Sequence, residues 1–273
     1  MNHVFLFGST WSLVPLALTF MVASPVWAQP LSTATVDRLR NQVTLTPANA
    51  PARPAQRQDV LRPQDQLSTG PGSLAQLIFN DQSLMRLGQN SVFQFAADRR
   101  EFILNQGVGM MITPRGAGAR IVTPAAVAAV QGSLVLTVVQ PTTPGQTSPN
   151  DRVTFFAFTS PIQLLDASEQ PLGTIPVGSV GTLQNGEFLG AAPFDFIGVL
   201  NQVPILRGLT TPAEDESPAT VAILASEKEV IDQVLPDLTP PSLNLQDPVN
   251  PNDLIRDPSQ VLPQERDITI IIN

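Results

Sequence analysis

The sequence has no cysteine and no tyrosine, and its single histidine is His3. Without cysteine the chain forms no disulfide, no thiolate metal site and no cysteine nucleophile. Because no histidine follows residue 3, serine–histidine catalysis is also excluded over the rest of the chain. We therefore predict that the protein is not an enzyme and that it uses no cofactor and no metal ion. A pair of carboxylates, as in glycoside hydrolysis, is the remaining enzymatic alternative.

Long apolar runs are missing after the first 28 residues. No later segment has the roughly 18 consecutive apolar residues that a membrane-spanning helix needs. Residues 4–22 are apolar, and the small residues of 23–28 follow them as in a cleavable export signal. We predict that residues 1–28 are a signal peptide, or an uncleaved signal anchor because residues 1–3 contain no Lys or Arg. Either form predicts a location in the periplasm or at the cell surface, with the anchor as the membrane contact.

Lysine is scarce, with Lys228 as the sole example, and the net charge of −8 is unevenly distributed. Residues 29–140 carry ten arginines against six carboxylates, whereas residues 141–273 carry five basic against seventeen acidic residues. Nucleic acid is a poor partner for an exported acidic chain. We predict an envelope protein or a polysaccharide as the partner. The candidate interaction surface, for which a solvated hairpin end is the alternative, consists of Arg99, Arg100, Arg115 and Arg120.

Short apolar runs separated by Gly, Pro, Asn and Asp fill the middle of the sequence. This rhythm predicts an all-β fold, a sandwich or jelly-roll-like domain of short antiparallel strands over residues 36–140. Residues 151–201 contain further strands that complete or flank this domain. Gly107 is expected to separate two strands, and Ala75, Leu77 and Phe79 to share the face toward the core. The phenylalanines of residues 155–158 and 194–196 are expected in the core rather than in a ligand groove.

Residues 202–273 are rich in proline and acidic residues and are predicted to form an extended tail. A capping box at 226–229 predicts one short helix near 226–235, ended by Pro236. The acidic run 214–216 is expected to be solvated rather than to bind calcium. Residues 268–272 are strongly β-prone and predict a strand that packs on its own domain or adds to a sheet edge through Ile268, Ile270 and Ile272.

Three segments taken together resemble a FecR-type domain. They are residues 65–79, which begin Asp-Gln-Leu-Ser-Thr-Gly-Pro-Gly-Ser, residues 81–91 and residues 123–134, where a Thr-Pro strand leads into a Gly-Ser turn. The resemblance covers about residues 36–139. It implies a compact all-β domain outside the inner membrane. In its best-known role such a domain receives a signal from an outer-membrane transporter and relays it to a sigma factor through a cytoplasmic N-terminal segment.

The sequence also departs from this family pattern. It starts directly with the signal-like segment, so we expect no cytoplasmic anti-sigma region, and Gln82 and Gln131 stand where the family often has a glycine and a basic residue. We therefore predict a divergent member that acts as a non-enzymatic, extracytoplasmic binding or signal-relay module. A structural or scaffold protein of the cell envelope is the first alternative, and a carboxylate-based glycan hydrolase is the second.

Overall fold

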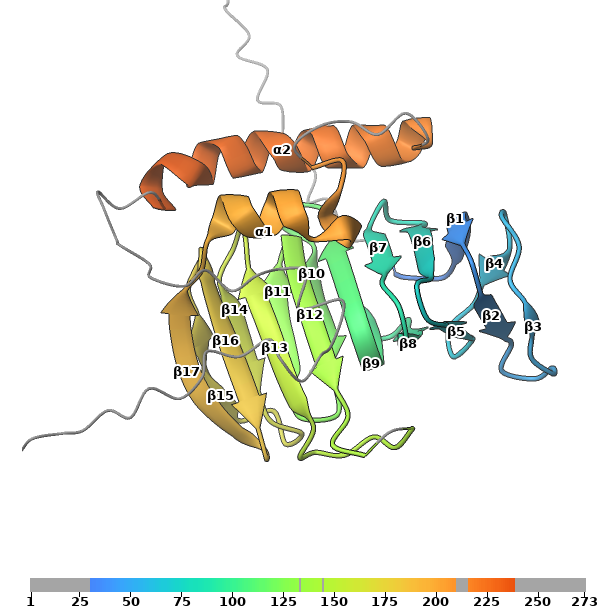
Figure 1. Ribbon diagram of the computed structural model, residues 1–273, viewed down its shortest axis with the longest axis horizontal. Coiled ribbons are helices and arrows are strands. Elements are labelled where there is room, and N and C mark those ends of the chain that lie inside the picture. Colours follow the sequence, from blue (N-terminus) through green and yellow to red (C-terminus); the bar gives the residue numbers. More distant parts are fainter. Residues whose placement is uncertain (1–29, 133, 144, 210–215, 239–273) are drawn as a thin grey trace, which may run out of the picture.

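The computed structural model describes residues 30–132, 134–143, 145–209 and 216–238. Within these ranges seventeen strands form one continuous sheet that folds into two layers, and helices follow the strands (Figure 1). This architecture confirms the predicted all-β fold. The predicted signal segment 1–28 and the predicted strand 268–272 lie outside the described residues.

The first layer, called here sheet A, is antiparallel throughout. It contains, in spatial order, β4 (Val60–Leu61), β1 (Ala34–Arg40), β6 (Leu74–Phe79), β7 (Leu84–Leu87), part of β9 (Glu101–Ile112), β12 (Leu134–Gln140), β13 (Arg152–Ala157), β16 (Ser179–Gln184) and β17 (Glu187–Pro193).

The second layer, sheet B, is antiparallel except for the β9–β10 pair, which is parallel. It contains, in spatial order, β3 (Arg53–Pro54), β2 (Val43–Thr46), β5 (Gln66–Thr69), β8 (Val92–Ala96), the remainder of β9, β10 (Gly118–Val122), β11 (Val127–Gln131), β14 (Ile162–Leu165) and β15 (Pro171–Ile175).

Strand β9 joins the two layers. Residues 101–106 pair in sheet B, and residues 107–112 pair in sheet A. Gly107, at the change of layer, has φ +91, a conformation in which side chains other than glycine are strained. The prediction that Gly107 separates two strands was therefore wrong, because the glycine bends one continuous strand instead of ending it.

The main core fills the space between the two layers. Phe79 of β6 packs edge-on against Phe95 and Phe102 of sheet B, with ring centroids 5.2 and 4.9 Å apart. Such edge-to-face pairs are favourable beyond the apolar area they bury. Phe155 of β13 is fully buried in the same core, as the sequence analysis expected. Interdigitation of the two inner faces thus holds the sandwich together.

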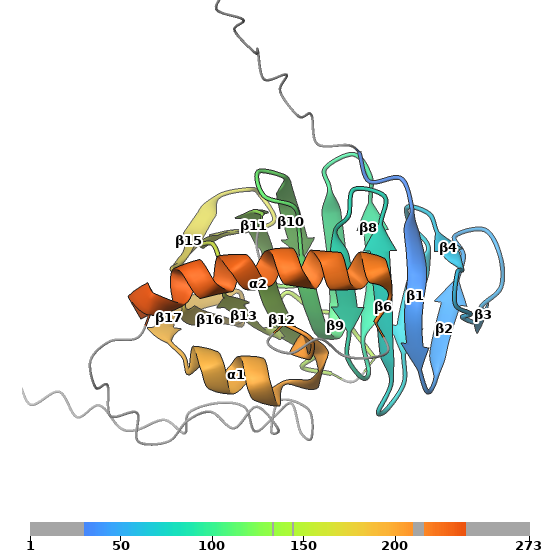
Figure 2. The ribbon, with the colours of Figure 1, turned by 90° about the horizontal axis from the view of Figure 1, so that it is seen from above.

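A second apolar cluster lies on the outer face of sheet A, where three helical segments cover it. These are α1 (Phe196–Gln202), the 3₁₀ turn η1 (Pro204–Leu206) and α2 (Pro218–Leu238). Figure 2 shows α2 crossing the sheet from the side of β6 toward β17. The central strands of sheet A are therefore buried on both faces, which explains why β12 (Leu-Val-Leu-Thr-Val-Val-Gln) is an almost unbroken apolar run.

Helix α2 corrects two predictions. The helix begins at Pro218 rather than near 226, with Ser217 capping it by accepting a hydrogen bond from the Thr220 amide at 3.3 Å, and Pro236 lies inside its last turn. The buried stripe Thr220, Leu224, Glu227 and Ile231 has helical spacing and packs on sheet A. Residues 216–238 are therefore not an extended tail, because this stripe buries the apolar surface that an extended segment would leave in water.

The described part of the chain contains no helix that is both long enough and apolar enough to span a membrane.

Candidate interaction site

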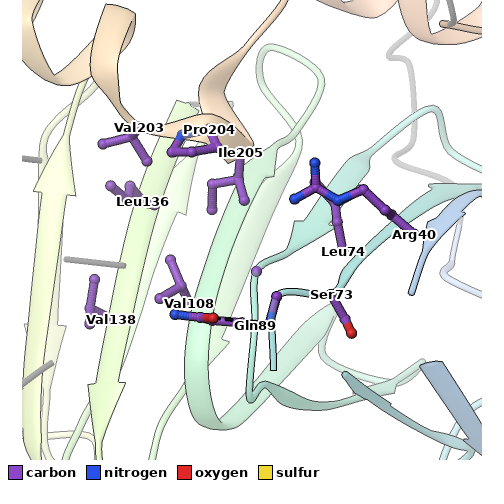
Figure 3. Close-up of a pocket in the computed structure, with 12 residues that line it drawn as sticks. Arg40, Ser73, Leu74, Gln89, Val108, Leu136, Val138, Val203, Pro204 and Ile205 are labelled. Atoms are coloured by element: carbon purple, nitrogen blue, oxygen red, sulfur yellow. Dashed lines mark hydrogen bonds between the residues drawn. The ribbon is translucent and has the colours of Figure 1, made fainter. Parts of the chain in front are cut away.

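A small apolar pocket lies between the outer face of sheet A and the segment that joins α1 to η1. It has a volume of about 70 Å³. Its walls are Val108 of β9, Leu136 and Val138 of β12, and Val203, Pro204 and Ile205, which face one another in Figure 3. A buried water needs about 10–15 Å³ on such a scale. The pocket, called here the η1 pocket, is thus large enough for one aliphatic side chain.

The mouth of the η1 pocket is polar. Arg40, at the end of β1, is exposed, and Ser73 and Gln89 lie in the neighbouring turns (Figure 3). Gln89 accepts a hydrogen bond from the Gly72 amide at 3.0 Å, which ties the two turns together. An apolar floor with a few polar groups at its edge is the usual composition of a recognition pocket.

Gly88 lies between Val108 of the sheet and Ile205 of η1. A Cβ at this position would lie 3.3 Å from Cβ of Val108 and 3.6 Å from Cγ2 of Ile205. The first separation is tighter than ordinary van der Waals contact. The second is ordinary contact, so glycine at position 88 leaves room for Val108, and η1 packs directly over it.

A buried polar cluster adjoins the pocket, and Arg86 of β7 is at its centre. Arg86 is 2 % exposed. Its guanidinium donates to Oε1 of Gln76, to the carbonyl oxygen of Ile205 at 3.2 Å, to that of Arg207, and to Oε1 of Glu216 at 2.8 Å. One side chain thus contacts the sheet, the η1 wall of the pocket and the residue that precedes the α2 cap.

Gln76, Asp37 and Thr220 extend the cluster toward β1 and α2. The Gln76 side-chain amide donates to Asp37 at 2.7 Å, to Thr220 at 2.9 Å and to Glu216 at 3.0 Å. The Thr220 hydroxyl donates to the same Asp37 oxygen at 3.1 Å. Gln76 and Thr220 are fully buried, so these hydrogen bonds satisfy polar groups that water does not reach.

The cluster balances its charges. Glu216, whose side chain is 1 % exposed, accepts from Arg86 and also from Arg38 at 3.0 Å. Asp37, the other carboxylate of the cluster, accepts from Gln76 and Thr220. Buried charges are tolerated when they are paired and hydrogen-bonded in this way. The expectation that residues 214–216 are solvated was wrong for Glu216, while residues 214 and 215 lie outside the described residues. We name this set the Arg86 cluster: Asp37, Arg38, Gln76, Arg86, Glu216 and Thr220.

Glu227 is a second buried carboxylate on α2, separate from the Arg86 cluster. It is 5 % exposed and accepts a hydrogen bond from the Thr159 hydroxyl at 2.7 Å. Thr159 in turn accepts from the Leu134 amide at 2.9 Å. Burial raises the pKa of Glu227 above its ordinary value of 4.5, and the Thr159 hydrogen bond and the Arg115 charge partly oppose that rise.

A wider hollow of about 460 Å³ lies beside the Arg86 cluster, between β1, the end of β6 and the start of α2. Asp37 is its sole acidic lining residue, and the η1 pocket has none. Neither of these two hollows among the described residues therefore offers the pair of carboxylates that a glycan hydrolase requires.

Comparison with known protein families matches residues 65–148 to the family described as FecR protein. This match contains all three segments on which the resemblance was based. The match confirms the resemblance to a FecR-type domain, a name kept here for residues 65–148. The match supports a role in signal relay in general. Eight residues of the η1 pocket come from the matched segment: Gly72, Ser73, Leu74, Gly88, Gln89, Val108, Leu136 and Val138.

No curated protein matches the chain. Two crystal structures of a candidate anti-sigma factor from Parabacteroides distasonis are similar, each with 16 % sequence identity and a TM-score of 0.39. Each comparison covers 50 % of this chain and 64 % of the other. The chain thus spans less than two thirds of the length of these structures.

The four arginines of the predicted interaction surface do not form one free basic patch. Arg100 pairs with Asp81 at 2.6 Å. Arg99 and Arg120 both contact Glu169 of the β14–β15 turn, at 2.6 and 3.3 Å. Arg115 lies elsewhere, close enough to α2 to affect Glu227. Three of the four are thus neutralised by carboxylates, and their role as a partner surface stays a prediction.

Sequence reasoning did not identify the η1 pocket or the Arg86 cluster. Gln76 and Arg86 occupy polar positions of alternating strands, which are typical of a solvated face, and Ile205 lies in the segment predicted to be a tail. The usable signal was the Ser217-Pro218 pair, because a capping serine followed by proline marks a helix start. A helix over 218–238 has to cover an apolar face, which would have indicated a third layer. Ile268, Ile270 and Ile272 lie outside the described residues.

Proposed function

We propose that this chain is a non-enzymatic signal-relay module that acts outside the cytoplasm and binds a protein partner through the η1 pocket. The observation that carries the proposal is the position of the pocket. Its floor belongs to the segment that matches the FecR family, and its outer wall belongs to the helical segment that follows the strands. A partner that fills the pocket therefore contacts both parts of the molecule.

The composition of the pocket supports one type of ligand. An aliphatic side chain fits the apolar walls, and the exposed guanidinium of Arg40 at the mouth favours a carboxylate beside that side chain. We propose an apolar residue flanked by Asp or Glu on an exported protein. The acidic excess of the second half of this chain would meanwhile disfavour binding of acidic partners elsewhere.

Site-specific photo-crosslinking tests the proposal. A photoreactive phenylalanine analogue in place of Arg40 is expected to form a covalent adduct with one exported protein in living cells. The matched control carries the same analogue in place of Arg62, which is exposed and does not line the pocket. The Arg40 adduct should disappear when Val138→Phe fills the pocket. An adduct that forms equally from position 62, or that survives Val138→Phe, would contradict the proposal.

A further inference from the structure

Arg86 bonds to both the pocket and the segment that leads into helix α2. It donates to the carbonyl oxygen of Ile205 in the η1 wall of the pocket and to that of Arg207, which follows η1. It also donates to the carboxylate of Glu216, one residue before the α2 cap. The two sets of bonds belong to one planar guanidinium, whose donors have a fixed relative geometry. A displacement of Glu216 therefore changes the position of the donors that hold η1.

Glu216 is the residue that attaches the start of α2 to sheet A. Its Oε1 accepts from Arg86 and Arg38, and its Oε2 accepts from Gln76. Thr220, one turn later, adds bonds to Gln76 and Asp37. The beginning of the helix is thus fixed by charged hydrogen bonds, which are worth more than neutral ones.

The remainder of α2 docks by different contacts. Ile231 packs in the apolar cluster, and Glu227 bonds to Thr159, which follows the end of β13. Leu238 at the end of the helix lies against Gly178, beside β16. These contacts hold the helix but do not involve Arg86. The apolar contacts of α2 also reach the η1 segment, since Leu224 and Ile231 share a cluster with Val203 and Ile205, so the contribution of Arg86 is the polar part of the connection between α2 and the pocket.

We infer that Glu216, acting through Arg86, couples the docking of α2 to the shape of the η1 pocket, so that occupation of the pocket and attachment of the α2 start are thermodynamically linked. Such linkage is reciprocal: a change at either site alters the other by the same factor. The inference rests on the proposed function in taking the pocket as the partner site. The coupling itself is a property of the chain alone.

Hydrogen exchange of the full chain, followed by mass spectrometry, tests the coupling. In Glu216→Gln the amide cannot accept hydrogen bonds at both ends, so it loses either its arginine or its Gln76 bonds. Loss of a hydrogen bond to a charged group corresponds to about tenfold or more in an opening equilibrium. We expect that increase in exchange both at residues 217–222 and at residues 203–209.

Glu227→Gln is the matched control, since it makes the same chemical change at a buried carboxylate within α2 without touching Arg86. It should leave exchange at residues 203–209 within about twofold of the unsubstituted chain. Three results would overturn the inference. The first is that Glu216→Gln changes the exchange of neither segment, and the second is that it changes the exchange of residues 217–222 alone. The third is that Glu227→Gln raises exchange at residues 203–209 as much as Glu216→Gln does.

The reverse direction is tested from the pocket. Pro204→Gly loosens the backbone of η1 while leaving every side chain of the Arg86 cluster in place. We expect faster exchange at residues 217–222, whereas Pro171→Gly, at the exposed start of β15, should leave those residues unchanged. Unchanged exchange at 217–222 in Pro204→Gly would contradict reciprocity. These measurements need no partner, so a failed crosslinking experiment would reject the proposed function and leave the coupling result standing.

Discussion

At the scale of single residues, Arg86 decides how the buried polar groups of the site are satisfied. Replacing it by Met keeps most of the length of the side chain but leaves the Glu216 carboxylate without its buried cation. Removing one partner of a buried ion pair typically costs about 3–5 kcal/mol. We predict a loss of that size in the free energy of unfolding of Arg86→Met, measured by urea denaturation. Arg62→Met, on the exposed turn, should change it by less than about 0.5 kcal/mol.

A cost below about 1 kcal/mol for Arg86→Met would show that Arg38 or water compensates for the missing guanidinium. The buried-pair account of the cluster would then be wrong, because the large cost depends on leaving a carboxylate uncompensated.

Glu227 predicts a specific pH dependence of stability. Burial raises its pKa above 4.5, so between 4.5 and the raised pKa the folded state binds more protons than the unfolded state. The contribution of Glu227 to folding is therefore most favourable at low pH and becomes less favourable as pH rises through the raised pKa. Glu227→Gln removes this titration. The thermal midpoint of Glu227→Gln minus that of the unsubstituted chain should therefore increase from pH 4 to pH 8. A difference that does not change with pH would contradict a raised pKa of Glu227.

The residues of the cluster show where sequence reasoning stops at this scale. Alternation in a strand correctly places Ala75, Leu77 and Phe79 toward the core, but it does not say whether the other face meets water or a third layer. Gln76 and Arg86 therefore gave no sign of their burial. The prediction that Glu216 is solvated was wrong for a related reason. A charged residue among prolines is usually exposed, and the buried partner of Glu216, Arg86, is 130 residues away in the sequence.

At the scale of elements, the bend in β9 depends on Gly107. A Cβ there would lie 2.4 Å from Oγ of Ser91 and 2.7 Å from the carbonyl oxygen of Asn90, in a backbone conformation that alanine rarely adopts. We predict that Gly107→Ala lowers the free energy of unfolding by about 3 kcal/mol or more. Gly118→Ala is the control, since a Cβ added there would meet nothing within 4 Å and its φ is not positive.

Gly118→Ala should be neutral or should stabilise by up to about 1 kcal/mol, because alanine restricts the unfolded chain. Equal effects of the two substitutions in urea denaturation would show that β9 tolerates a side chain at the bend, and the account of how one strand serves both layers would fail.

Element boundaries were predictable where a local signal decided them and not where packing did. Most short strands of the FecR-type domain coincide with apolar runs between turn residues, because each strand is bounded by its own turn chemistry. The full length of β9 was not predicted, because Gly107 bends the strand and does not end it. Helix α2 was predicted too short because Ser226 also fits a capping box, whereas burial of Thr220 and Leu224 against sheet A extends the helix back to Pro218.

At the scale of the whole molecule, the chain is a two-layer β-sandwich with a third, helical layer on one face (Figures 1 and 2). The strand rhythm predicted the all-β fold, and the match at residues 65–148 confirmed the FecR resemblance. The helical layer was missed because its prolines and acidic residues resemble those of an extended tail. The proposed binding pocket exists because that layer meets the FecR-type segment, so it could not be inferred from either part alone.

The central claim is that the η1 pocket recognises the partner. Calorimetric titration of this chain with the purified protein that the crosslinking experiment identifies tests the claim most directly. Val138→Phe fills the pocket and should weaken binding at least tenfold, about 1.4 kcal/mol in binding free energy. The thermal midpoint of Val138→Phe should stay close to that of the unsubstituted chain. Arg62→Glu should bind like the unsubstituted chain. If Val138→Phe binds the partner as tightly as the unsubstituted chain does, the pocket is not the recognition site.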